Sequence, residues 1–333
     1  MKILIADKFE KAGVDGLKAL GCEVISEPDA GVDGIPAALT KHKPTVLVVR
    51  STKVPAASVK VAGEVGVKVI VRAGAGVDNI DIGAATGIGV KVCNCPGTNA
   101  IAVAELTFGL LLACDRRIVD QTLDARAGNW NKKEYGKTGA GGAKGLKGMT
   151  LGVVGAGAIG RAVVKRAVAF EMKPVIWSRS ITQEHCRDLG AEWGGNDTPA
   201  LLALAPRCDA VTVHLPLAPD TKGLIGKGFL DAMKPNSIII NTSRGGLIDE
   251  AALREAIAAK GLRAGLDVWE NQPGQAVTEP GQWNSETAKL TKVVATHHSG
   301  ASTDQSQDAI AREVVRMMGV FHATGRVENC VNA

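Results

Sequence analysis

The feature that most constrains this chain is a glycine-rich turn that follows a short apolar segment. Residues 151–154 form a β-prone run, and the chain continues directly into Gly155, Gly157 and Gly160. In a strand–turn–helix unit with this spacing, the first glycine permits the tight turn, the second lets a pyrophosphate approach the backbone, and the third lets helix and strand pack closely. The spacing therefore predicts a dinucleotide-binding unit. The residues expected at the pyrophosphate are Gly155, Gly157, Ala158, Ile159 and Gly160.

The end of the next predicted strand indicates which dinucleotide binds. In such units this strand usually ends in an Asp or Glu that accepts hydrogen bonds from the ribose hydroxyls. Here it ends in Ser178, Arg179 and Ser180, without an acid. An arginine fork flanked by hydroxyls suits a ribose 2′-phosphate. The sequence therefore favours NADP, and NAD is the alternative if Arg179 is only a solvated surface residue.

Composition and charge narrow the possible partners. The chain has 333 residues, of which 45% are hydrophobic, and this is enough to form the hydrophobic cores of two domains. The formal charge of +5 comes from 39 basic and 34 acidic residues without a Lys/Arg block, so we expect a small anionic substrate and neither nucleic acid nor membrane. The absence of a leader-like start or an 18-residue apolar run predicts a cytoplasmic protein. Seven cysteines lack a CxxC pair, so no metal site is expected.

Short apolar segments alternate with helix-like segments along the chain, as in α/β proteins with parallel sheets. We expect two Rossmann-like or flavodoxin-like parallel-sheet domains with a cleft between them. Residues 1–98 plus 299–333 would form a substrate domain and residues 99–298 a dinucleotide-binding domain, with a polar loop or hinge at 129–148. The strands are expected at 2–6, 23–26, 45–49, 68–71, 90–94, 150–154, 174–177, 210–215, 237–242, 264–268 and 293–296, and the longest helices at 100–113 and 304–323.

Polar residues follow several strands of the second series, namely His214, Thr242, Ser243, Arg244 and Asp267. Ligands of doubly wound sheets bind outside the carboxyl ends of the strands. We therefore expect these side chains, with His298 beyond the last strand, to line the ligand site.

Several further segments carry recognisable motifs in a fixed order. They are 71–79 (VRAGAGVDN), 103–105 (VAE), 154–160, 214–216 (HLP), 241–246 (NTSRGG), 266–268 (LDV), His298 and 300–303 (GAST). With these motifs, nearly the whole chain resembles the D-isomer-specific 2-hydroxyacid dehydrogenase family, most closely its short D-3-phosphoglycerate dehydrogenase-like members. The resemblance implies an enzyme that transfers a hydride between a nicotinamide cofactor and a D-2-hydroxy acid or its 2-keto acid.

The resemblance also implies roles for individual residues. Arg244 would bind the substrate carboxylate and polarise the C2 oxygen, and His298 would exchange a proton with that oxygen. Asp267 would meet the nicotinamide amide or its ribose. The expected substrate residues are Arg50, Arg72, Ala73, Gly74, Ala75, Gly76 and Arg244. The further cofactor residues are Ser178, Arg179, Ser180, His214, Leu215, Pro216, Thr242, Ser243, Asp267 and Gly300.

One position departs from the family pattern. Five residues after Asp267, where the family has a glutamate that pairs with the catalytic histidine, this chain has Gln272. A carboxylate would favour the protonated imidazole and orient it, whereas an amide orients it without supplying charge. We therefore expect Gln272 to partner a His298 that is mostly neutral at pH 7, with keto-acid reduction favoured at acidic pH. Glu270 or Glu279 are alternative partners.

The sequence leaves the substrate open. Arg50, Arg72 and Lys132 could receive a phosphate, or could be ion-paired or solvated. The alternative function is an NADPH-dependent hydroxypyruvate or glyoxylate reductase. Less expected are a formate dehydrogenase, in which a His/Gln pair also occurs, and a cofactor-sensing corepressor.

The resemblance further implies a homodimer formed through the dinucleotide-binding domains. The segment from about Leu112 to Gly148 would cross to the partner. Domain closure over the substrate would occur at connections near residues 95–98 and 297–299.

Overall fold

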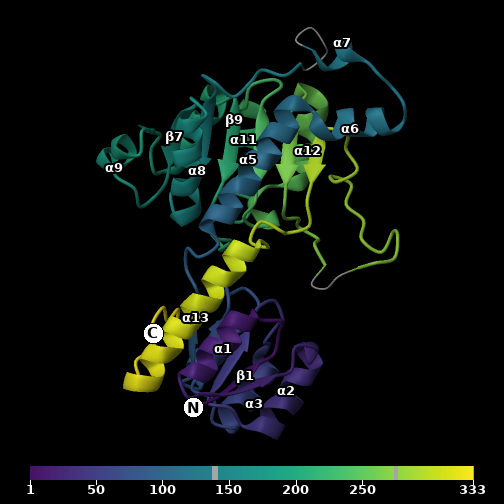
Figure 1. Ribbon diagram of the computed structural model, residues 1–333. Coiled ribbons are helices and arrows are strands. Elements are labelled where there is room, and N and C mark those ends of the chain that lie inside the picture. Colours follow the sequence, from purple (N-terminus) through teal and green to yellow (C-terminus); the bar gives the residue numbers. More distant parts are fainter. Residues whose placement is uncertain (137–141, 274–276, 333) are drawn as a thin grey trace. The chain divides into compact units, whose positions relative to one another are not determined.

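The chain folds into two α/β units, each built on its own parallel sheet (Figure 1). The computed structural model describes residues 1–136, 142–273 and 277–332. One unit comprises Met1–Asn99 and Ala301–Ala333, and the other comprises Ala100–Gly300. The last helix of the chain, α13 (Asp304–Thr324), therefore returns to the first unit and packs there on α1 (Lys11–Ala19).

The first unit is a five-stranded sheet in the order β2-β1-β3-β4-β5, which is the flavodoxin-like order. Its strands are β1 (Lys2–Ile5), β2 (Glu23–Ser26), β3 (Val46–Val49), β4 (Val69–Arg72) and β5 (Lys91–Cys93). The remaining helices of this unit are α2 (Gly31–His42), α3 (Ala56–Glu64) and α4 (Ile82–Gly87).

Alternation along the strands divides the interior of this unit into two cores. Ile3 and Ile5 pack on the α1 and α13 side, whereas Leu4 packs with Ile35 and Leu39 of α2. Because successive side chains of a strand point to opposite faces, continuous apolar strands of this kind require helices on both faces.

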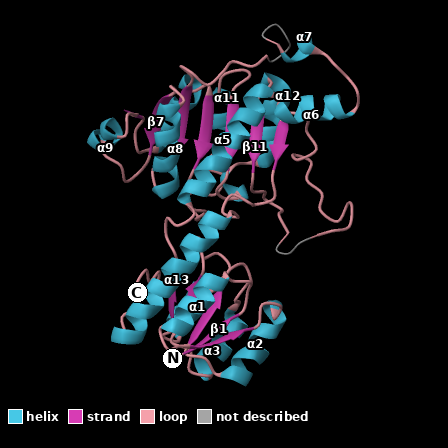
Figure 2. Cartoon of the chain, viewed as in Figure 1, coloured by secondary structure: helices cyan, strands magenta, loops and turns pink. Residues whose placement is uncertain are grey.

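The second unit is a seven-stranded parallel sheet in the order β12-β11-β10-β9-β6-β7-β8, drawn as a row of arrows in Figure 2. This is a Rossmann order extended by one strand, with its topological switch between β6 and β9. The strands are β6 (Thr150–Val154), β7 (Lys173–Trp177), β8 (Glu192–Trp193), β9 (Ala210–Val213), β10 (Ile238–Asn241), β11 (Arg263–Leu266) and β12 (Val293–Ala295).

Helices again cover both faces of this sheet. The helices are α5 (Ala100–Arg116), α6 (Ile118–Arg126), α7 (Lys132–Tyr135), α8 (Ala158–Ala169), α9 (Gln183–Asp188), α10 (Thr198–Leu204), α11 (Lys227–Ala232) and α12 (Glu250–Lys260). One core packs Leu151 and Val153 against α5 and α8, and the other packs Val211 and Val213 against α10, α11 and α12.

The predicted α/β class with two parallel-sheet domains is confirmed, and every predicted strand has a counterpart in the structure. The two-residue strand β8 was not predicted because both of its residues are exposed and carry no apolar alternation. The expected loop at 129–148 contains the short helix α7, and residues 137–141 of that prediction lie outside the described part of the chain. Within the described ranges, no helix is long and apolar enough to span a membrane.

Candidate active site

The strand register of the second unit places several predicted site residues along one edge. Val154 pairs with Val213, Val213 with Asn241, and Asn241 with Leu266. The residues that follow these strand ends therefore emerge side by side at the carboxyl edge. They are Gly155, His214, Thr242 and Asp267.

The glycine turn has the geometry that its spacing predicts. Gly155 has a φ of +103°, and a Cβ there would lie 2.3 Å from the His214 carbonyl oxygen. A Cβ on Gly160 would lie 2.0 Å from the Gly155 carbonyl oxygen, whereas one on Gly157 would meet nothing within 4 Å. Gly157 is the N-cap of α8 and provides no side-chain cap, so the first N–H groups of α8, at Ala158 and Ile159, form an open anion-binding helix end.

The end of β7 places a positive charge beside this turn. Ser178 is buried, and its hydroxyl accepts a hydrogen bond from the Ser180 N–H at 3.5 Å. The Arg179 guanidinium forms an ion pair with Asp220, which lies on the loop after β9. This pairing was not predicted, because the two residues are 41 positions apart and no local pattern links them.

His214 is buried rather than presented to solvent. Its Nε2 lies 2.9 Å from the Thr212 hydroxyl, and burial lowers the pKa of His214 to about 3. The imidazole is therefore neutral at physiological pH. The Leu215 side chain lies against the Gly155 turn, and the Pro216 carbonyl oxygen accepts a hydrogen bond from Thr221.

The loop after β10 is held by hydrogen bonds of the two residues that precede Arg244. The Thr242 hydroxyl meets the Thr107 hydroxyl at 3.0 Å, and the Ser243 hydroxyl donates to the Val213 carbonyl at 2.7 Å. The Arg244 guanidinium donates to the Ser243 carbonyl at 2.8 Å. These bonds fix the backbone from which the Arg244 side chain extends.

Two residues without a predicted site role support the loops that carry Arg244 and Gln272. Asn241 donates to the Arg244 carbonyl at 2.8 Å. Glu250, which is buried, accepts a hydrogen bond from the Glu270 N–H at 2.8 Å and so ties α12 to the loop that carries Gln272. For Glu250, the only signal in the sequence was an acid at the start of α12, which could not be distinguished from an ordinary acidic residue in a first helical turn.

The Asp267 carboxylate binds the loop that carries the predicted catalytic histidine. It is 1% exposed and accepts hydrogen bonds from the Thr296 hydroxyl (2.6 Å), the Ser299 N–H (2.8 Å) and the Gly300 N–H (2.9 Å). The His298 N–H donates to the Asp267 carbonyl at 2.7 Å. Asp267 thus has a positioning role that the sequence did not reveal.

His298 and Gln272 are hydrogen-bond partners, the pairing that the family resemblance implies at this position. The Gln272 side-chain nitrogen lies 2.8 Å from His298 Nδ1. The Trp269 N–H donates to Gln272 Oε1 at 3.4 Å, which leaves the amide NH₂ to face the imidazole. Nδ1 therefore accepts, and the proton of the neutral ring sits on Nε2. His298 has a φ of +51°, in the left-handed region that bulky residues seldom adopt.

The predicted substrate residues of the first unit also share one edge. Arg72 ends β4, and the chain then turns through Ala73, Gly74, Ala75 and Gly76. Gly74 has a φ of +149°, a backbone conformation that L side chains rarely adopt, and a Cβ there would lie 1.4 Å from Arg72 Nη1, so a side chain at this position would displace the guanidinium. The Asn94 amide holds the Ala75 carbonyl at 2.5 Å.

Arg50 follows β3 at the same edge. Its N–H and those of Ser51 and Thr52 all donate to the Asp7 carboxylate. The neighbouring aspartate therefore binds the Arg50 backbone.

Lys132 does not join the candidate site within its own chain. It lies on α7, which is tied through Glu134 to Arg117 (2.8 Å). Arg117 also binds Asp120, which in turn binds Arg263, the first residue of β11. Lys132 thus lies at the amino edge of the sheet, opposite to the edge of Arg244.

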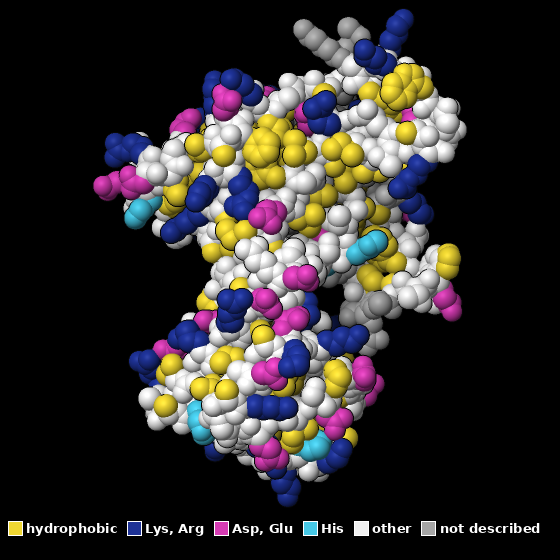
Figure 3. Space-filling view, in the orientation of Figure 1, with side chains coloured by type: hydrophobic (Ala, Val, Ile, Leu, Met, Phe, Trp, Pro, Cys, Tyr) yellow, Lys and Arg dark blue, Asp and Glu magenta, His cyan; other side chains and the backbone are white. Residues whose placement is uncertain are grey.

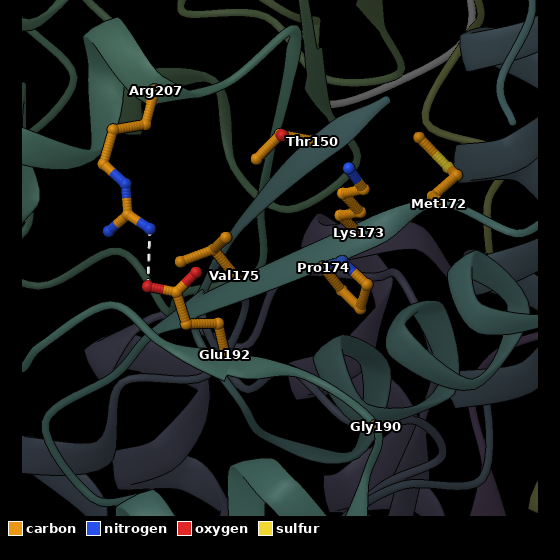
Figure 4. A pocket seen from close by; sticks show the side chains of 8 residues that line it. All are labelled: Thr150, Met172, Lys173, Pro174, Val175, Gly190, Glu192 and Arg207. Carbon is orange, nitrogen blue, oxygen red and sulfur yellow. Dashed lines mark hydrogen bonds and ion pairs between the residues drawn. The ribbon is translucent and has the colours of Figure 1, made fainter. Parts of the chain in front are cut away.

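No group of three His, Cys, Asp or Glu side chains suited to a metal ion occurs among the residues that the structure describes. Two hollows in the described structure lie away from these residues. One of them, at the amino edge, is lined by Lys173, Glu192 and Arg207 among others (Figure 4).

Comparison with known proteins identifies the second unit. The NAD-binding domain of D-isomer-specific 2-hydroxyacid dehydrogenases matches residues 108–300. The D-3-phosphoglycerate dehydrogenase of Methanocaldococcus jannaschii is 38% identical over 100% of this chain and 59% of its own length, so the chain spans less than two thirds of that relative. The hydroxypyruvate reductase of Thermotoga maritima is 41% identical over 81% of this chain and 82% of its own.

A solved structure agrees over the whole chain. The NAD⁺-bound 3-phosphoglycerate dehydrogenase of Entamoeba histolytica is 27% identical with a TM-score of 0.79, covering 100% of this chain and 99% of its own. The open glycine turn fits the nicotinamide dinucleotide that the family model implies. The chain belongs to the D-isomer-specific 2-hydroxyacid dehydrogenase family.

Proposed function

We propose that this protein catalyses hydride transfer between a nicotinamide cofactor and a D-2-hydroxy acid, with D-3-phosphoglycerate as the first candidate. The observation that carries the proposal is the His298 imidazole, held by Gln272 at 2.8 Å on a loop that Asp267 binds. When bound, the nicotinamide supplies or accepts the hydride. A fixed imidazole is what the accompanying proton transfer requires.

The chain's own residues would divide the remaining work. Arg244 would bind the substrate carboxylate and polarise the C2 oxygen through its charged fork. As the imidazolium, His298 would donate the Nε2 proton to that oxygen during reduction. During oxidation the neutral ring with its proton on Nδ1 would accept a proton at Nε2, with the Gln272 amide turned so that its oxygen faces Nδ1. Backbone N–H groups at residues 73–76 would hold the second carboxylate oxygen.

The alternative is an NADPH-dependent hydroxypyruvate or glyoxylate reductase. Arg50 and Arg72 are the remaining candidates for a substrate phosphate in this chain. One relative of similar identity is a hydroxypyruvate reductase, and hydroxypyruvate carries no phosphate.

Initial rates with a substrate panel test the proposal. The panel comprises 3-phosphohydroxypyruvate, hydroxypyruvate, glyoxylate, oxaloacetate and phenylpyruvate with NADH or NADPH, and formate with NAD⁺ or NADP⁺. We expect kcat/KM for the phosphorylated acid to exceed that for hydroxypyruvate by about tenfold, which corresponds to roughly 1.4 kcal/mol of phosphate binding. A preference for hydroxypyruvate or glyoxylate would establish the alternative. Turnover of formate alone would overturn both.

For the cofactor we propose a preference for NADP(H) over NAD(H). Arg179 lies next to the glycine turn, and the β7 end carries no acid to accept ribose hydroxyls. Arg179 would bind the 2′-phosphate, and Ser178 and Ser180 would lie beside that phosphate.

Replacing Gln272 by Glu is expected to extend keto-acid reduction to higher pH. Reduction uses the imidazolium form, so its rate falls as pH rises and that form loses its proton. The amide NH₂ of Gln272 faces Nδ1 and disfavours the imidazolium, whereas a carboxylate there would stabilise it. We expect the falling limb of the reductive kcat/KM profile to move up by about one pH unit, as a charge partner of roughly 1.4 kcal/mol would cause. An unchanged profile would contradict this role of Gln272.

A homodimer is also proposed. Large apolar side chains lie exposed on and beyond α6, where Figure 3 shows hydrophobic side chains gathered. They are Ile118, Val119, Leu123 and Trp130, and Trp130 is 87% exposed. An apolar surface of this kind is typical of a protein interface. Light scattering should give about twice the mass of one chain, and a monomer mass at micromolar concentration would contradict the proposal.

A further inference from the structure

We propose that Asp220 is a cofactor-specificity residue that weakens binding of the 2′-phosphorylated cofactor by occupying Arg179. The inference rests on the proposed cofactor function. Arg179 follows β7 and Asp220 follows β9, and β6 with its glycine turn lies between these two strands. The ion pair therefore joins the two loops that flank the expected adenosine end of the dinucleotide.

Hydrogen bonds within the loop of Asp220 hold the backbone that carries its carboxylate. Thr221 is buried, with 2% of the residue exposed. Its hydroxyl donates to the Pro216 carbonyl at 2.7 Å and accepts from the Ala218 N–H at 2.8 Å. The Lys222 N–H also donates to the Ala218 carbonyl, at 2.9 Å. A closed turn with a buried threonine thus fixes the backbone on either side of Asp220.

The same loop is tied to the glycine turn by a separate contact. The His214 carbonyl and the Leu215 side chain occupy the space that a Cβ on Gly155 would need. The His214 N–H also donates to the Val154 carbonyl at 2.7 Å. The position of Asp220 relative to the cofactor turn is therefore set by backbone contacts and does not depend on the Arg179 pair itself.

The charges predict the direction of the effect. A 2′-phosphate would compete with the Asp220 carboxylate for the Arg179 fork and would be repelled by it, whereas a free 2′-hydroxyl would meet neither cost. The side chains of Arg179 and Asp220 are 54% and 58% exposed, so their pair is weak and water-screened. Asp220 should therefore moderate the preference for NADP(H) rather than abolish it.

Nucleotide binding measured by calorimetry tests this without turnover. The probes are 2′,5′-ADP and 5′-AMP, which differ only in the 2′-phosphate. We expect Asp220→Asn to bind 2′,5′-ADP about three- to tenfold more tightly than the wild type does, with 5′-AMP changed less than about twofold. The gain should shrink with added salt because the charges are exposed. The gain in affinity should be largely lost when Arg179→Ala is combined with Asp220→Asn.

Glu192→Gln is the matched control. Glu192 forms an ion pair with Arg207 at 2.5 Å at the amino edge of the same sheet, as the dashed line in Figure 4 shows, and the two side chains are 60% and 44% exposed. This variant removes the same charge from a similar pair and should change neither affinity.

The outcomes separate the two proposals. If the wild type binds both probes but Asp220→Asn leaves the affinity for 2′,5′-ADP unchanged, or raises both affinities equally, the role of Asp220 is refuted and the cofactor proposal stands. If the wild type binds neither probe, the cofactor function fails and this inference fails with it.

Discussion

Replacing His298 by Asn is expected to lower kcat/KM for keto-acid reduction by about 10²- to 10⁴-fold, the usual contribution of a positioned general acid. The asparagine has no group that can protonate the C2 oxygen. Cofactor binding should be retained, because the glycine turn and Arg179 are untouched. Steady-state kinetics together with cofactor titration by fluorescence would measure both effects.

Asparagine is the appropriate replacement because of the backbone at this position. His298 has a φ of +51°, and Asn tolerates the left-handed region better than Ala or Gln does. His297→Asn is the matched control, since that neighbouring imidazole packs edge-on against Trp283 at 6.3 Å between ring centroids. The control should retain near-normal activity. If His298→Asn kept more than about a tenth of the wild-type kcat/KM, a proton-transfer role of that size would be ruled out.

The sequence predicted those parts of the site that depend on local patterns. The spacing of Gly155, Gly157 and Gly160 defines a turn whose geometry follows from steric demands within a few residues. The apolar strands likewise located both sheets, because a strand buried on both faces reads as a continuous apolar run. The Gln272–His298 contact followed from a family pattern that places the partner directly before a proline.

The parts that escaped prediction depend on contacts between distant segments. Asp220 reaches Arg179 only because β9 and β7 flank β6, an order that no local pattern specifies. Lys132 resembled a phosphate-binding position, yet the pairing of Glu134 with Arg117 holds its helix at the opposite sheet edge. The ion pairs of these side chains determine where the residues lie, and the sequence does not show which charged residues pair with each other.

Replacing Asp267 by Asn is expected to lower both stability and activity. In the wild type one carboxylate oxygen accepts from Gly300 N–H and the other from Ser299 N–H and the Thr296 hydroxyl. The amide of asparagine keeps one oxygen acceptor but turns its NH₂ toward the Gly300 N–H, so this buried N–H loses its acceptor. The free energy of unfolding should fall by about 1–3 kcal/mol, and the His298 loop should shift. Displacement of a catalytic group by about 1 Å can reduce the rate by roughly 10².

Asp115→Asn is the control that separates the loss of stability from the loss of activity. Asp115 is also buried, and its carboxylate accepts hydrogen bonds from the Lys144 and Gly145 N–H groups at 2.9 and 3.1 Å. It lies at the amino edge of the sheet, away from His298. Both variants should lose stability in denaturant unfolding, since each turns an amide NH₂ toward a backbone N–H that had donated to the buried carboxylate. Only Asp267→Asn should also lose kcat/KM at temperatures where both proteins are folded, because only its loop carries His298. Equal activity in the two variants would mean that Asp267 supports the fold alone and that His298 is positioned by Gln272 without it.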